Sequence, residues 1–254
     1  MSDETKKSAA AALKGRLRRY PALYRTLRSL LLPINRRLEV SRWRRAGRPV
    51  PPPHAFKQLT IDGYRRAFRL ATLVETGTYL GDTVEAQRKQ FRKVVSIELS
   101  PDLCRAAQSR FANMKNVTVL EGDSADLLES VVAQLRGPTL FWLDGHYSAG
   151  ITAQGGLDTP VQRELEIILG SPENHVILVD DARCFGSGDY PTLDGVRALV
   201  GNLRPDWACV VEDDIIRISA RHQSSVSRRG RRSGEPGAHP TRPASGPGSA
   251  DPGS

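Results

Sequence analysis

Acidic residues follow a series of short apolar segments, at the positions where buried strands of a sheet would end. They are Glu75, Glu98, Asp123, Asp144 and the adjacent pair Asp180 and Asp181. In an open α/β sheet, ligands bind outside the carboxyl ends of the parallel strands, so these side chains would converge on one crevice. A single acid at a strand end is an ordinary polar loop residue. Its repetition along the chain predicts a binding site lined with carboxylates.

The first of these acids leads into a turn that contains two glycines. Apolar residues precede Glu75, and Gly77 and Gly81 bracket a tight turn before a helix expected over residues 83–91, with Val84 facing the sheet. Glycine lets the backbone pass close to a ligand, because no Cβ stands in the way. The pattern is Gly-x-x-x-Gly and not the Gly-x-Gly-x-x-Gly that seats a pyrophosphate. The pattern therefore points away from a dinucleotide; the acid would also repel phosphates but could pair with an ammonium group. The alternative is a purely structural turn.

Alternating strands and helices are expected to position these residues. Apolar runs predict further strands over residues 93–98, 117–120, 139–143 and 176–179, and a hairpin of residues 207–211 and 215–219. Helical patterns cover residues 57–70, where Ile61, Tyr64 and Phe68 share a face, the segment after Ser100-Pro101, and residues 127–135, 160–169 and 193–203. This alternation predicts a doubly wound α/β domain with a parallel sheet covered on both faces.

Three segments together resemble the successive motifs of class I S-adenosylmethionine-dependent methyltransferases. They are Val-Glu-Thr-Gly-Thr-Tyr-Leu-Gly at residues 74–81, Ser-Ile-Glu at residues 96–98 and Glu-Gly-Asp-Ser at residues 121–124. The resemblance covers about residues 57–220. It implies a Rossmann-like sheet of seven strands in the order 3-2-1-4-5-7-6, with the last strand antiparallel. It also implies a cofactor site in which Glu75, Gly77, Tyr79 and Gly81 flank the methionine part, Glu98 holds the ribose hydroxyls, and Asp123 with Ser124 borders the adenine.

A narrower resemblance concerns the acids after the fourth and fifth strands. Phe-Trp-Leu-Asp-Gly-His-Tyr at residues 141–147 and Leu-Val-Asp-Asp-Ala at residues 178–182 are similar to the metal-binding segments of catechol-type O-methyltransferases. This resemblance implies that Asp144, Asp180 and Asp181 hold Mg²⁺, a hard cation suited to oxygen ligands. The chain has Asp-Asp where that family has Asp-Asn. Adjacent strand residues point to opposite faces, so both can be ligands only if the chain turns between them. The alternative is that these acids are helix caps or bind an acceptor without metal.

The base that would activate the acceptor departs from that family's pattern. A lysine is expected three positions after Asp144, but this chain has Ser148, which leaves His146 as the substitute general base. A Gly-rich stretch follows up to residue 160, with Tyr147, Thr152 and Gln154 as candidate contacts to the acceptor; it is either a substrate loop or a plain surface loop. The expected reaction is methyl transfer to an oxygen of a small molecule, with a sugar as one candidate.

The charge of the chain is concentrated outside the expected domain. The net charge is +9, yet residues 51–220 hold 17 Lys and Arg against 23 Asp and Glu, while the first 50 residues hold 14 against three. A nucleic-acid-binding core should carry its own basic face, so no nucleic-acid partner is expected. The basic helical pattern over residues 8–32 is either packed on a protein surface or rests on an anionic membrane. An adaptor at the membrane surface, or a cofactor-binding module without catalysis, is the alternative function.

The chain divides by composition into three parts. Residues 1–53 form a basic helical extension that ends in a proline linker, residues 54–220 form the methyltransferase-like domain, and residues 221–254 form a tail too poor in apolar residues to fold. Cys104, Cys184 and Cys209 make no close pair and indicate reduced thiols in a cytoplasmic protein. Neither a membrane-spanning run nor a secretory signal is expected, so contact with a membrane would be peripheral.

Overall fold

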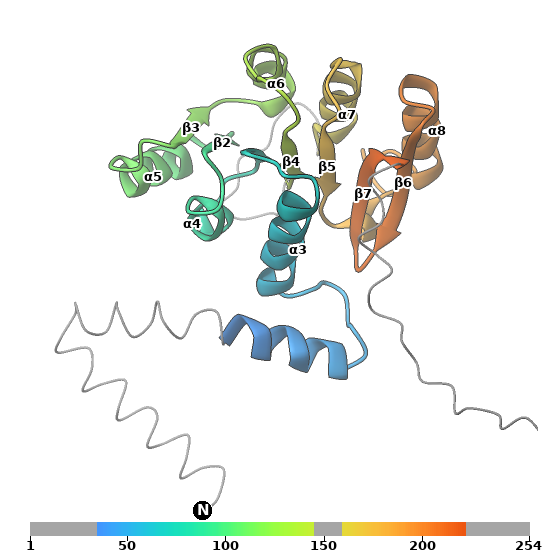
Figure 1. Cartoon of the computed structure of the whole chain (residues 1–254), viewed down its shortest axis with the longest axis horizontal. Helices are drawn as coiled ribbons and strands as arrows, with labels where there is room; N and C mark the ends of the chain where they lie inside the picture. The colour runs from blue at the N-terminus through green and yellow to red at the C-terminus, as the bar shows by residue number, and fades with distance from the viewer. Residues whose placement is uncertain (1–34, 145–158, 222–254) are drawn as a thin grey trace, which may run out of the picture. The chain divides into compact units, whose positions relative to one another are not determined.

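A single sheet of seven strands organises the computed structural model, which describes residues 35–144 and 159–221 (Figure 1). The strand order is β3-β2-β1-β4-β5-β7-β6. The strands are β1 (Thr72–Thr76), β2 (Lys93–Glu98), β3 (Val117–Glu121), β4 (Leu140–Leu143), β5 (Val176–Val179), β6 (Trp207–Glu212) and β7 (Ile215–Ala220). Strands β1 to β5 are parallel, and β7 is antiparallel to both β5 and β6. The predicted fold class and strand order are confirmed.

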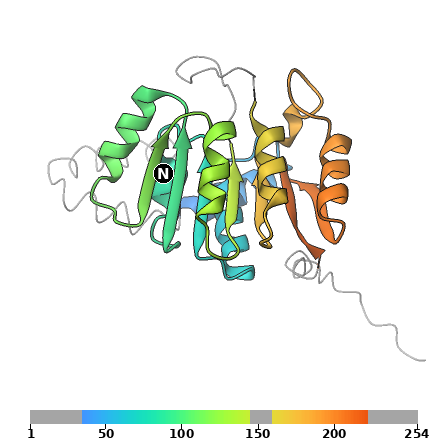
Figure 2. The same cartoon turned by 90° about the horizontal axis from the view of Figure 1, so that it is seen from above.

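Helices cover both faces of the sheet, as Figures 1 and 2 show. They are α3 (His54–Ala67), α4 (Asp82–Gln87), α5 (Pro101–Phe111), α6 (Ser124–Ala133), α7 (Val161–Gly170) and α8 (Leu193–Leu203). One apolar core joins α6, α7 and α8 to one face, through residues such as Leu128, Leu165 and Val196. A second core joins α3, α4 and α5 to the other face, through Ile61 and Val84 among others. Burial on both faces explains why the central strands are continuous apolar runs.

The helix after the Gly turn is shorter than predicted, and the side chain of Asn116 binds carbonyl groups of the segment that follows it. The helix was expected over residues 83–91, but α4 ends at Gln87. Asn116 Nδ2 donates to the carbonyl oxygens of Arg88 at 2.7 Å and Phe91 at 3.1 Å. Val84 faces the core as predicted and is fully buried. The helix predicted over residues 57–70 lies three residues earlier, because Arg69 adopts a left-handed conformation (φ 54°) that ends it.

Residues 35–53 pack against the domain in the part that the structure describes. A helix over residues 35–45 buries Val40 and Trp43, and the Trp43 ring lies 4.5 Å from the Phe56 ring of α3, between centroids. Trp43 Nε1 also donates to the Pro49 carbonyl at 2.7 Å. The basic pattern of residues 8–32 and the tail from residue 222 lie outside the described residues. Within the described ranges, no helix is both long and apolar enough to cross a membrane.

Candidate active site

Glu98, at the end of β2, holds the turn after β1 in place through hydrogen bonds. Oε2 of Glu98 accepts a hydrogen bond from the backbone N–H of Tyr79 at 2.7 Å, and Oε1 accepts one from Ser100 at 2.9 Å. Tyr79 has a positive φ of 48°, and its side chain is exposed. Glu98 as a whole residue is 5% exposed. Glu98 therefore fixes the shape of the turn, and each of its oxygens keeps a lone pair for a ligand.

The two glycines of this turn are both left-handed, but Gly81 is needed for packing. Their φ angles are 82° at Gly77 and 75° at Gly81. A Cβ at Gly81 would lie 2.8 Å from a ring carbon of Phe111 in α5. The sequence suggested that glycine keeps the backbone open to a ligand. At residue 81 the structure gives a different reason, because the neighbour that excludes a side chain belongs to the protein.

Glu75 is a buried acid at the carboxyl end of β1. It is 2% exposed, and Ser96 Oγ donates to its Oε2 at 2.5 Å, while Ser96 Oγ also lies 2.6 Å from Thr78 Oγ1. Burial raises the pKa of Glu75 from 4.5 to about 8, against the hydrogen bonds of Ser96 and Thr83, and the nearby Glu98 charge adds to the rise. A cationic group of a ligand placed beside this carboxyl group would stabilise its charged form.

Asp123 and Ser124 begin α6, and both engage the protein itself. Asp123 is the N-cap residue, and its Oδ1 accepts from the Ala125 backbone N–H at 2.9 Å. Ser124 is buried, and its hydroxyl faces the carboxyl group of Glu164 in α7. The cap explains why an acid stands at residue 123, and it leaves the second carboxylate oxygen for other partners.

The acids after β4 and β5 come together in one cluster, because the chain turns after Asp180. Strand β5 ends at Val179, and Asp181 is left-handed (φ 54°, ψ 46°), with its backbone N–H donating to Asp180 Oδ1 at 2.9 Å. One oxygen from each of Asp144, Asp180 and Asp181 lies within 4.8 Å of the others. Burial and the neighbouring Asp180 charge raise the pKa of Asp144 well above its usual value. Burial also raises the pKa of Asp180 to about 6.

Lys57, a residue that the sequence analysis did not single out, reaches this acid cluster from α3. Its Nζ forms a close ion pair with Asp180 Oδ2 and lies 3.5 Å from Asp181 Oδ1. Burial alone would lower the pKa of Lys57, but the charge and hydrogen bond of Asp180, with the charges of Asp144 and Asp181, raise it overall. A signal was present: Lys57 stands four positions before the fully buried Ile61 and therefore on the apolar stripe of the helix.

Asp181 is also bound from the outer side of the cluster. Nη1 of Arg183 lies 2.7 Å from Asp181 Oδ1 and makes a second, closer ion pair with Asp214. Asp214 belongs to the two-residue turn between β6 and β7, and its Oδ1 accepts from the Arg183 backbone N–H at 2.8 Å. The predicted hairpin thus closes the sheet and also fixes the loop that carries Asp181.

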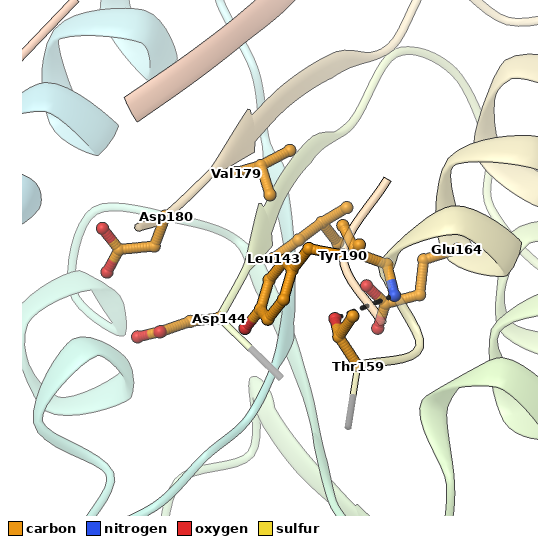
Figure 3. Close-up of a pocket in the computed structure, with 8 residues that line it drawn as sticks. Leu143, Asp144, Thr159, Glu164, Val179, Asp180 and Tyr190 are labelled. Atoms are coloured by element: carbon orange, nitrogen blue, oxygen red, sulfur yellow. Dashed lines mark hydrogen bonds between the residues drawn. The ribbon is translucent and has the colours of Figure 1, made fainter. Parts of the chain in front are cut away.

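A pocket opens beside the acid cluster (Figure 3). Its lining combines acids and hydroxyl groups with the apolar ends of β4 and β5: Leu143, Asp144, Thr159, Val161, Glu164, Val179, Asp180 and Tyr190. Burial raises the pKa of Glu164 to about 7, against a hydrogen bond from Ser124. The hydroxyl of Tyr190 and the carboxyl groups of Asp144 and Asp180 lie on the same side of the view.

Glu164, Thr159 and Tyr190 were not predicted, because nothing in their local sequence distinguishes them. The predicted His146, Tyr147, Ser148, Thr152 and Gln154 lie outside the described residues.

The order of the strands and the antiparallel β7 identify the architecture. The chain has the class I S-adenosylmethionine-dependent methyltransferase fold. No protein-family model matches the sequence, and no curated protein does. Among solved structures, the chain is similar to an O-methyltransferase from Bacillus cereus in complex with SAH, at 16% identity and a TM-score of 0.48, over 78% of this chain and 96% of that one.

Two further solved structures have the same degree of similarity. The SAH-bound methyltransferase PaMTH1 of Podospora anserina has 16% identity and a TM-score of 0.47, over 75% of this chain and 87% of that one. The O-methyltransferase TomG of Streptomyces achromogenes, in complex with SAM, has 17% identity and a TM-score of 0.45, over 73% and 88%. Structural similarities of this size do not identify the methyl acceptor. The fold assignment rests on the strand order and strand directions of the sheet. Function must be argued from the site.

Proposed function

We propose that the protein transfers a methyl group from S-adenosylmethionine to an oxygen of a small-molecule acceptor, with a sugar among the candidates. The observation that carries the proposal is the adjacency of two acidic sites with different surroundings. Glu75 lies at the end of β1, and Asp144 lies just after the neighbouring β4, with its backbone N–H donating to the Thr76 carbonyl at 3.1 Å. One site suits the cofactor, and the other site suits the acceptor.

The residues at the ends of β1 and β2 fit the cofactor by their chemistry. S-adenosylmethionine supplies a sulfonium methyl group when it is bound, and it carries an ammonium group but no phosphate. Glu75 would pair with the ammonium group, because no described residue makes an ion pair with this buried carboxyl. Glu98 would accept from the ribose hydroxyls through the lone pairs that the backbone N–H groups leave. Asp123 and Ser124 would border the adenine, and the Gly77–Gly81 turn would flank the methionine part.

The acceptor would bind beside Asp144, against the residues that line this pocket. Its polar lining suits a hydroxylated small molecule, because carboxyl groups accept hydrogen bonds from hydroxyl groups and the Thr159 and Tyr190 side chains can do so too. The chain would then perform two tasks: it would hold the acceptor oxygen in line with the methyl group, and it would remove the hydroxyl proton. His146 is the proposed base and Asp144 its proposed partner at the acceptor.

The predicted Mg²⁺ site is supported by the donor set but not by its surroundings. Three carboxylates with oxygens within 4.8 Å of one another are ligands that Mg²⁺ prefers. However, the ammonium group of Lys57 already contacts two of these carboxylates, and Arg183 binds one of them from outside. A divalent ion would compete with Lys57 and Arg183 for these carboxylate oxygens.

Cofactor binding and methyl transfer test the proposal separately. In calorimetric titrations, S-adenosylmethionine is expected to bind and NAD is not; tighter binding of NAD would refute the cofactor assignment. A panel of hydroxylated acceptors with a labelled methyl donor then tests transfer. Binding of the cofactor without transfer to any acceptor on the panel would favour the alternative of a non-catalytic binding module.

A further inference from the structure

The carboxylates after β4 and β5 enclose a cation that belongs to the chain. Lys57 comes from the first turn of α3, ahead of β1 in the sequence, and it contacts Asp180 and Asp181 after β5. The side chains are 12% exposed for Lys57, 0% for Asp180 and 7% for Asp181. The charge of Asp144 also acts on Lys57. The ammonium group thus contacts two of the three acids that form the candidate metal site and interacts with the charge of the third.

The Lys57 side chain is only 12% exposed, so its charge needs these contacts. An unpaired ammonium group that is largely removed from water would be strongly unfavourable, and an ion pair with good hydrogen bonds offsets that penalty. The same contacts relieve the repulsion among the carboxylates. Lys57 and the acids therefore stabilise one another. A divalent ion would reduce the repulsion among the carboxylates in the same way.

The ammonium group of Lys57 and a divalent metal ion would compete for the same carboxylates, and their positive charges would repel each other. A Mg²⁺ ion would need carboxylate oxygens at about 2.0–2.1 Å in a nearly octahedral shell. The ammonium group lies at ion-pair distance from Asp180 and Asp181, so a divalent ion bound by both carboxylates would lie close to it. A divalent ion brought there would also meet the positive charge of Lys57 at close range.

We propose that Lys57 is the resident cation of this acid cluster and replaces the divalent ion, so that the protein binds no metal there while Lys57 is present. The consequence for catalysis is an acceptor site without a metal, and this consequence rests on the proposed function. The contacts themselves do not depend on methyl transfer. Metal binding can therefore be measured whether or not an acceptor is known.

The test compares the wild type with Lys57→Met, which keeps an apolar stem and removes the charge. Mn²⁺ serves as a paramagnetic probe, with free Mn²⁺ counted by electron paramagnetic resonance, and Mg²⁺ is added in thermal melts. The wild type is expected to leave Mn²⁺ free and to show no rise in melting temperature with Mg²⁺. Lys57→Met is expected to melt lower in EDTA, to bind about one Mn²⁺ and to be stabilised by either ion, by linkage. Lys89→Met, at an exposed lysine, is the matched control and should behave as the wild type.

Two results would overturn the inference. The first is stoichiometric Mn²⁺ binding by the wild type that Asp144→Asn abolishes, which would show that a metal and Lys57 coexist or that Lys57 yields. The second is a folded Lys57→Met that binds no metal, because Lys57 would then not be what excludes it. If that variant does not fold, Lys57→Gln replaces it, and the wild-type titration still decides the first point. S-adenosylmethionine titrated into the same samples reports separately on the proposed function.

Discussion

Replacing Glu75 by Gln should remove a large pH dependence from the stability of the cofactor-free protein. In the folded chain Glu75 has a pKa of about 8, raised by burial, against 4.5 as the ordinary value. The folded state therefore keeps a proton that the unfolded state releases. The stabilisation linked to this proton is complete below pH 4.5 and is lost as the pH rises through 8.

The magnitude follows from the size of this shift. Between pH 5 and 7.5, one such group lowers the free energy of unfolding by about 1.4 kcal/mol per pH unit, or about 3 kcal/mol in total. Glutamine is neutral at every pH, and its amide oxygen can still accept from Ser96 Oγ, which lies 2.5 Å from Glu75 Oε2 in the wild type. Glu75→Gln should therefore match the wild type near pH 5 and melt about 6–12 °C higher at pH 7.5.

The assay is a series of thermal and urea unfolding curves at several pH values between 5 and 7.5, on protein stripped of cofactor. Glu121→Gln, at an exposed acid at the end of β3, is the control and should keep the wild-type slope. Equal pH slopes for the wild type and Glu75→Gln would refute the reasoning. Added S-adenosylmethionine should reverse the order at pH 7.5, because only the wild type can offer a carboxylate to the ammonium group.

Three other changes test separate parts of the structure. Glu98→Ala should weaken S-adenosylmethionine binding by about 1–3 kcal/mol in calorimetry, the usual loss for a charge-assisted hydrogen bond, and should also lower the melting temperature because the Tyr79 amide loses its acceptor. An unchanged affinity would remove Glu98 from the site. Gly81→Ala should lower the free energy of unfolding by about 1–3 kcal/mol, since φ is positive and the new Cβ meets Phe111; adding Phe111→Leu should recover part of the loss, and no recovery would contradict the packing argument. Deleting residues 222–254 should leave the melting temperature unchanged, and a large drop would show that this tail is docked; the cut spares Arg221, whose Nε donates to the Trp207 carbonyl at 3.3 Å.

The amino-acid sequence by itself determined the sheet and the edge at which the candidate site lies. Apolar runs such as Lys93–Glu98 and Val176–Val179 have the predicted bounds, because strands buried on both faces can contain little else. The placement of acids at strand ends also followed from the sequence. Parallel strands present their carboxyl ends at one edge, so an acid after each strand needs no further information to be placed.

Only the tertiary structure decided which partners these acids have. Lys57 and Asp180 are 123 positions apart, and no local pattern connects a lysine in one helix to an aspartate after a distant strand. The left-handed turn at Asp181, which brings both aspartates to one side, likewise depends on Asp214 and Arg183. Local sequence sets the direction of a side chain along its own element. The charge that faces it is set by how separate elements pack, and here that packing brings a lysine into contact with the acids that suggested a metal site.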